Sequence, residues 1–258
     1  MTPNNSRQLS KVPEVTATFW IIKIVATTLG EIGGNAASMS LHLGYVVSTA
    51  IFAVIFIGAV VAQVKAARFQ PALYWLTITV TTILGTTTAD LVTRDLGIGY
   101  TGGSLILLAG VLGSLALWRW TTGTVSVESV ATPTVEAFYW ITIMWSQTLG
   151  TALGDWFADT AGLGYLWSSL IFAAALLLIY LLYRATSMSR VALFWAAFII
   201  TRPFGAVFGN LFDKPPASGG LGVNRFVASA LLIVLMAAMI WIFPQRAARS
   251  NERAGNFS

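Results

Sequence analysis

One pattern of residues occurs four times along this chain, and it limits the possible folds more than any other feature. Each copy begins at a tryptophan, and these are Trp20, Trp75, Trp140 and Trp195. A glycine follows ten residues after each tryptophan. An asparagine or aspartate follows after fifteen residues, at Asn35, Asp90, Asp155 and Asn210. A fixed register over four copies indicates an internal repeat in which every copy is one supersecondary unit.

A long stretch without charge follows each copy of this pattern, at residues 45–64, 96–118, 161–183 and 226–243. A helix that spans the hydrocarbon of a bilayer needs about 20 predominantly apolar residues. Only 10% of the residues are charged, whereas a soluble domain has about a quarter. The sequence therefore predicts an all-α integral membrane protein whose main partner is the lipid bilayer.

Each copy is interpreted as a first helix that begins just before the tryptophan, a glycine-rich turn and a second helix. This predicts eight transmembrane helices, arranged as four parallel two-helix repeats with pseudo-symmetry. The expected segments are a cytoplasmic N-terminal segment at 1–15, repeats one and two at 16–120, a linker at 121–136, repeats three and four at 137–244, and a cytoplasmic tail at 245–258.

The basic residues indicate an orientation. Most lie before a first helix or after a second helix, and only Arg94, Lys214 and Arg225 fall on the side of the turns within the repeats. The positive-inside rule then places both termini in the cytoplasm. The net charge is +5, but the basic residues are scattered singly, so we expect no nucleic-acid partner. The absence of cysteine excludes disulfides and thiolate metal sites.

Polar side chains recur at matching depths in the first helices. The position eleven residues after each tryptophan lies roughly 16 Å into the membrane, and the asparagine or aspartate lies one turn further on the same helix face. The candidate substrate-binding residues are Glu31, Asn35, Thr86, Asp90, Gln147, Thr151, Asp155 and Asn210. Three of them, Glu31, Asp90 and Asp155, are also candidate metal ligands, because carboxylates suit hard cations.

Two basic residues lie within the first helices and are candidates for a gate or a counter-ion. Lys23 is one turn past its tryptophan, so we expect it to extend to the cytoplasmic surface. Arg202 lies deeper, and the counter-ion role is favoured for it; Pro203 directly after it is expected to kink or break the helix. Pairs of small residues four apart, such as Gly150 and Gly154, predict that the first helices pack closely against one another.

These motifs resemble a known family. The segments Thr27-Thr28-Leu29-Gly30-Glu31, Gln147-Thr148-Leu149-Gly150-Thr151 and Thr201-Arg202-Pro203 are similar to the bacterial "repeat of unknown function" membrane proteins, which are four-repeat membrane-anchored proteins. The resemblance covers nearly the whole chain. It implies a helical protein of the bacterial inner membrane and brings no activity with it. Asn35 departs from the aspartate expected at the end of the first motif, so the first copy supplies a single carboxylate.

Carboxylates inside a membrane are costly, which makes each of them a functional hypothesis. The leading hypothesis is a transporter or channel for a small ion or solute, with a cation such as H⁺, Na⁺, Mg²⁺ or Mn²⁺ favoured. The alternative is a scaffold or sensor in which the buried polar residues only fix the packing. A membrane enzyme ranks third, because the sequence has no HExxH, GxSxG or Walker motif. We expect neither enzymatic activity nor a cofactor.

Overall fold

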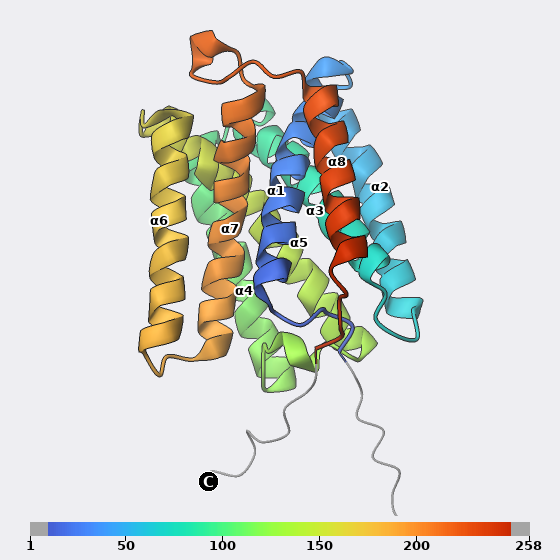
Figure 1. Ribbon diagram of the computed structural model, residues 1–258. Helices are drawn as coiled ribbons and strands as arrows, with labels where there is room; N and C mark the ends of the chain where they lie inside the picture. Colours follow the sequence, from blue (N-terminus) through green and yellow to red (C-terminus); the bar gives the residue numbers. More distant parts are fainter. Residues whose placement is uncertain (1–9, 249–258) are drawn as a thin grey trace, which may run out of the picture.

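The computed structural model describes residues 10–248, and this part of the chain forms eight α-helices and no β-sheet (Figure 1). The predictions that fall on residues 1–9 and 249–258 lie outside the described residues. Four helices, here called the inner helices, are α1 (Ala17–Asn35), α3 (Pro71–Asp90), α5 (Pro133–Asp155) and α7 (Arg190–Asp213). The four outer helices are α2 (Gly44–Lys65), α4 (Gly99–Thr122), α6 (Gly164–Ala185) and α8 (Arg225–Ile242).

Local sequence signals explain where the inner helices begin. Thr16, Thr132 and Ser189 each accept a hydrogen bond from a backbone N–H in the first turn of α1, α5 and α7, respectively, as N-cap residues do. Pro71 and Pro133 occupy the first turn of α3 and α5, where the missing N–H costs nothing.

The ends of three inner helices share one form. Each continues into a five-residue π-helical segment, at Ala36–Ser40, Leu91–Asp95 and Trp156–Thr160. The fourth, α7, runs to Asp213 and is followed by a short 3₁₀ turn at Pro216–Ser218. The prediction that Pro203 would kink or break its helix is wrong about the break, since α7 is one continuous helix through this residue.

The inner helices form a closed ring. Packing joins α1 to α3, α3 to α5, α5 to α7, and α7 back to α1. Each outer helix packs on the inner helix that follows it in the chain: α2 on α3, α4 on α5 and α6 on α7. The last outer helix, α8, packs on α1. The two ends of the sequence therefore complete the same ring.

Glycines set the spacing within this ring. A Cβ added to Gly30 would overlap Thr82 of the next inner helix, and one added to Gly85 would lie 2.8 Å from the backbone carbon of Gln147. The same relation places Gly150 against Arg202, and Gly205 against Thr27 across the ring closure. The prediction that small residues bring these helices into close contact is confirmed.

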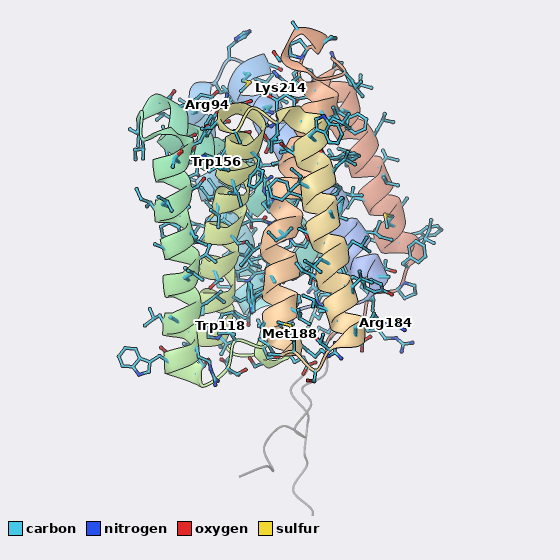
Figure 2. All side chains as sticks on the ribbon, turned by 90° about the vertical axis from the view of Figure 1, so that its left-hand side faces the viewer. Arg94, Trp118, Trp156, Arg184, Met188 and Lys214 are labelled. Carbon is cyan, nitrogen blue, oxygen red and sulfur yellow. The ribbon has the colours of Figure 1, made fainter. Side chains whose placement is uncertain are left out.

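The surface of the bundle is apolar along its length. By length and composition, five helices could cross a membrane: α2, α4, α6, α7 and α8. Leu105, Leu177 and Leu231 on the outer helices are all more than half exposed, which suits contact with lipid chains. Figure 2 shows Arg94 and Lys214 at one end of the bundle and Arg184 at the other. The fold is thus consistent with a multi-pass membrane protein.

The two ends of the described chain meet at the same end of the bundle (Figure 1). The backbone N–H of Ser10 donates to the carbonyl of Ala248 over 3.1 Å, and that of Ala248 donates to Val12 over 2.9 Å. Lys11 forms a 2.7 Å ion pair with Glu136 at the start of α5. The backbone hydrogen bonds tie the segment before α1 to the segment after α8, and the ion pair ties it to α5.

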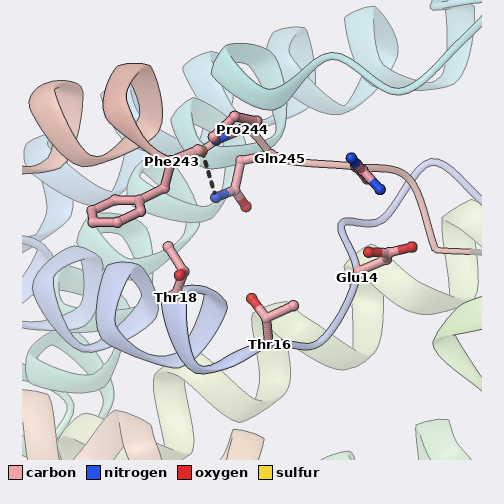
Figure 3. A pocket seen from close by; sticks show the side chains of 7 residues that line it. Glu14, Thr16, Thr18, Phe243, Pro244 and Gln245 are labelled. Carbon is pink, nitrogen blue, oxygen red and sulfur yellow. Dashed lines mark hydrogen bonds between the residues drawn. The ribbon is translucent and has the colours of Figure 1, made fainter.

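A small cavity of about 350 Å³ remains between the start of α1 and the end of α8 (Figure 3). Thr16 and Thr18 line one side, and Phe243 and Gln245 line the other. The Gln245 amide donates a 3.2 Å hydrogen bond to the Phe243 carbonyl, so its polar head is already engaged within its own segment.

Candidate functional site: a buried polar column

Side chains from the four inner helices fill the middle of the ring in three layers, which we call the polar column. None of its twelve residues is more than 2% exposed. The first layer holds Thr27, Thr82, Gln147 and Arg202, seven residues after each tryptophan. The second holds Glu31, Thr86, Thr151 and Ala206, and the third holds Asn35, Asp90, Asp155 and Asn210. Because successive layers are four residues apart, each helix contributes one column of side chains facing the axis.

Arg202 connects all four inner helices. From α7, its Nη2 lies 3.3 Å from Glu31 Oε2 on α1 and donates to Thr86 Oγ1 on α3 over 2.6 Å. The same nitrogen donates to Thr151 Oγ1 on α5. Arg202 is completely buried and forms an ion pair with Glu31, and its role as an internal counter-ion stays a prediction.

Two small residues make room for this large side chain. Gly150 on α5 lies where any Cβ would overlap the Arg202 side chain. Ala206, which is one turn after Arg202, takes the place in the second layer where the other repeats have Glu31, Thr86 and Thr151. The fourth repeat thus supplies a longer side chain in the first layer and a shorter one in the second.

The third layer is a chain of hydrogen bonds across the ring. Arg94 Nε lies 2.8 Å from Asp90 Oδ1, and Arg94 Nη2 lies 3.1 Å from Asp155 Oδ2. The Asn210 amide donates to Asp155 over 3.3 Å, and the Asn35 amide donates to Asn210 over 3.0 Å. Arg94 therefore bridges carboxylates from two helices, and the two amides continue the chain from Asp155 to α7 and α1.

Two further charged residues at this end, Arg94 and Asp213, are part of the network. Arg94 is 29% exposed but holds both buried aspartates. Asp213 is buried, accepts from the Asn35 amide over 3.2 Å, and lies 2.5 Å from Arg225 Nε. The sequence spacing could have indicated both residues, because residues three or four apart on a helix are neighbours. Arg94 is four residues after Asp90, and Asp213 is three residues after Asn210.

The predicted metal site needs correction. Within residues 10–248 no group of three or more His, Cys, Asp or Glu side chains is placed to hold a metal ion. Glu31 lies in the second layer and pairs with Arg202, whereas Asp90 and Asp155 lie in the third layer and share Arg94. The acids therefore meet guanidinium groups rather than one another.

The prediction for Lys23 is also wrong. This residue does not extend to the surface: it is completely buried, and its Nζ lies 3.5 Å from the ring centroid of Phe198. Within the described part of the chain, its Nζ has no hydrogen-bond partner and forms no ion pair. The side chain stays inside because it lies on the face of α1 that points into the ring, where a cation over an aromatic face is attracted to it.

Aromatic side chains close the column at the end where the termini lie. Tyr74, Trp75, Tyr139 and Trp140 are at most 2% exposed and pack together in edge-on and tilted pairs. The hydroxyls of Tyr74 and Tyr139 are 2.6 Å apart. The polar column is thus sealed at this end and has charged groups at the other.

Comparison with known families identifies the family of this chain. A family model described as Repeat of Unknown Function (DUF347) matches residues 18–69, 73–124, 138–189 and 193–247. The chain belongs to this family. In this DUF347 chain, all twelve residues of the polar column fall within the matched stretches. No curated protein and no solved structure was found to match the chain. The function must therefore be argued from the site itself.

Proposed function

We propose that this protein is a membrane transporter or channel for a small ion or solute, above all a cation, and that the polar column is its pathway. In this proposal all eight helices span a cytoplasmic membrane with both termini inside. Five helices are apolar enough by composition alone, and α1, α3 and α5 owe their lower hydropathy to polar residues that face the ring. The observation that carries the proposal is the fully buried group of Arg202, Glu31, Thr86 and Thr151.

Packing alone does not require such a group. Replacing a buried ion pair with apolar side chains of similar volume is often neutral or stabilising. In a membrane, ionisable residues mark ion pathways and proton relays. Inside this ring, moreover, both amide atoms of Gln147 and the Nζ of Lys23 have no partner among the described residues. Buried polar atoms normally have a protein or water partner, so these two side chains favour a column that water or an ion enters.

Among small cations, H⁺ suits this geometry best. A proton moves along hydrogen bonds and needs no cavity, whereas Mg²⁺ and Ca²⁺ need six or more oxygen ligands. The described residues offer no acidic cluster for a metal ion, but they do offer hydroxyls and a carboxylate that are hydrogen-bonded within the second layer, and carboxylates and amides that are hydrogen-bonded within the third.

One observation favours the alternative of a scaffold or sensor. Each acid of the column already has an arginine partner, at 3.3 Å for Glu31, 2.8 Å for Asp90 and 3.1 Å for Asp155. Neutralised acids can serve as internal hydrogen-bonding groups that fix the register of the helices. This alternative predicts a well-folded protein that carries no flux.

The deciding experiment is proton flux in proteoliposomes that contain a pH-sensitive dye, with a potassium diffusion potential as the driving force. The test variant is Asp155→Asn, because Asp90 continues to hold Arg94 and the new amide keeps a hydrogen-bonding group beside Asn210. Asp95→Asn is the matched control, since this acid is exposed on the turn after α3.

The proposal expects flux in the wild type and the control, and at least a tenfold loss in monodisperse Asp155→Asn. Wild-type vesicles that acidify no faster than empty vesicles would overturn the assignment to H⁺. The same vesicles loaded with indicators for Na⁺, Mg²⁺ or Mn²⁺ then test the remaining cations.

A further inference from the structure

A second cavity, separate from the column, opens on the outside of the bundle between α6 and α1. Its volume is about 960 Å³, which is at the upper end of the range for small-molecule sites. Leu176 and Ile179 of α6 form one wall, Trp20 and Ile24 of α1 form the other, and Phe194 of α7 lies between them. We call this cavity the lateral groove.

The groove exists because one repeat departs from the pseudo-symmetry of the others. Three outer helices begin at a glycine, and the position nineteen residues after it holds Gln63 on α2, Trp118 on α4 and Tyr183 on α6. Gln63 and Trp118 are 1% and 0% exposed, whereas Tyr183 is 49% exposed. The side chain that fills the bundle in two repeats therefore points away from it in the third.

The aromatic contacts show the same difference. Trp118 packs edge-on against Trp195, the tryptophan of the repeat two places further on, with ring centroids 5.8 Å apart. The equivalent partner of Tyr183 around the closed ring is Trp20, and both residues line the groove. Tyr183 instead packs under the guanidinium of Arg190, 4.2 Å from its ring centroid. The space occupied by an indole between α4 and α7 is thus left open between α6 and α1.

The chemistry of the groove indicates its occupant. Its walls are apolar and face outward between membrane-type helices, so acyl chains fit them. Charges of both signs lie at its mouth, where Arg190 is joined by Glu14 and Glu128. A head group that carries both a phosphate and an ammonium complements this combination, whereas a purely anionic head group would meet two carboxylates.

We propose that the lateral groove binds one zwitterionic phospholipid of the phosphatidylethanolamine type. Its acyl chains lie between α6 and α1, its phosphate lies near Arg190, and its ammonium lies near Glu14 and Glu128. This proposal rests on the membrane placement in the proposed function and not on transport. The lipid covers the contact between α7 and α1, where the ring closes. It fills the space that is equivalent to the one filled by the Trp118 side chain between α4 and α7.

The test measures lipid retained by the purified, detergent-solubilised protein after incubation with phosphatidylethanolamine, phosphatidylglycerol or phosphatidylcholine, read by native mass spectrometry. Ala197→Trp places an indole in the groove from α7, while Leu178→Trp is the matched control on the lipid-facing side of α6, where Leu178 is 57% exposed. Arg190→Gln tests the mouth without filling the groove.

The expected result is one phosphatidylethanolamine retained per wild-type chain, at least fivefold in excess of phosphatidylglycerol. Leu178→Trp keeps this retention, Ala197→Trp loses it, and Arg190→Gln lowers it severalfold. Equal retention of the two lipids by the wild type would overturn the head-group assignment, and undiminished retention by Ala197→Trp would overturn the location. Because no flux is measured, a failure of the transport proposal leaves this result unaffected, and the reverse also holds.

Discussion

The closed ring of inner helices can be tested with a single methyl group at Gly85. A Cβ built there lies 2.8 Å from the backbone carbon of Gln147 and 3.0 Å from the backbone nitrogen of Thr148. Carbon atoms in favourable contact are about 3.5–4.0 Å apart. The obstacle is backbone rather than a side chain that could rotate away. Gly85→Ala therefore forces α3 and α5 apart.

The size of the effect follows from two opposing terms. Overpacking a close contact costs about 1–3 kcal/mol, while replacing glycine by alanine within a helix gains about 0.8–1.0 kcal/mol. Gly113→Ala on α4 isolates the second term, because Gly113 is exposed and no described atom lies within 4 Å of its added Cβ. The difference in unfolding free energy between the two variants thus measures the packing term alone, about 1–3 kcal/mol.

The assay is reversible unfolding in mixed micelles with an increasing fraction of denaturing detergent, followed by tryptophan fluorescence. Trp75 and Trp140 are buried on the two helices that separate, so the signal reports this contact. We expect Gly113→Ala to be as stable as the wild type or slightly more stable, and Gly85→Ala to be less stable. Equal stability of the two variants would refute the close approach of α3 and α5.

Three further predictions use the same unfolding assay. Arg202→Lys keeps the charge but loses the planar fork that reaches several partners, so stability should fall by about 1.5–3 kcal/mol; an unchanged value would show that charge alone matters there. Tyr74→Phe removes the hydroxyl pair with Tyr139 and should cost about 1 kcal/mol, and a neutral result would mean that the two hydroxyls are not bonded. Lys11→Met leaves the buried Glu136 without its cation and should cost about 2 kcal/mol, whereas no loss would show that the link between the N-terminal segment and α5 is unimportant.

The periodicity of the sequence was sufficient to predict the second and third layers of the polar column. Positions four residues apart must share a helix face, and small residues at fixed positions indicate close helix contacts. These two rules placed Glu31 and Asn35 on one face of the first inner helix and predicted that the inner helices pack closely. The first rule concerns one helix and the second concerns a contact that recurs between successive helices. A repeated sequence carries both kinds of information.

The errors concern relations that the repeat does not encode. The sequence did not reveal that each outer helix covers the next inner helix, because this depends on how four copies close into a ring. It also did not indicate which acid meets which base. Lys23 was expected to reach the surface, but the rotation of α1 in the ring points it at Phe198. Asp90 and Asp155 were expected to bind a metal ion, but the turn after α3 brings Arg94 between them.

The ring also leads to a prediction about chain connectivity. The last helix, α8, packs on α1 as α2 packs on α3, and Ser10 is hydrogen-bonded to Ala248. The segments before α1 and after α8 therefore lie side by side within a closed ring of helices. A circular permutant joins residue 258 to residue 1 and begins at Thr124. Its chain break then lies in the segment between α4 and α5, next to the exposed Gly123.

This permutant keeps every helix–helix contact, so we expect a monodisperse protein. Its unfolding free energy should lie within about 2 kcal/mol of the wild type, since loop-closure entropy changes slowly with loop length.

A truncation after Gly222 is the informative comparison, because it removes α8 and uncovers α1. A repeat array that is open in space would give the opposite pattern. Its terminal helix would be dispensable, and joining its ends would strain it. A stable truncation together with an aggregated permutant would therefore show that α1 and α7 do not close the ring.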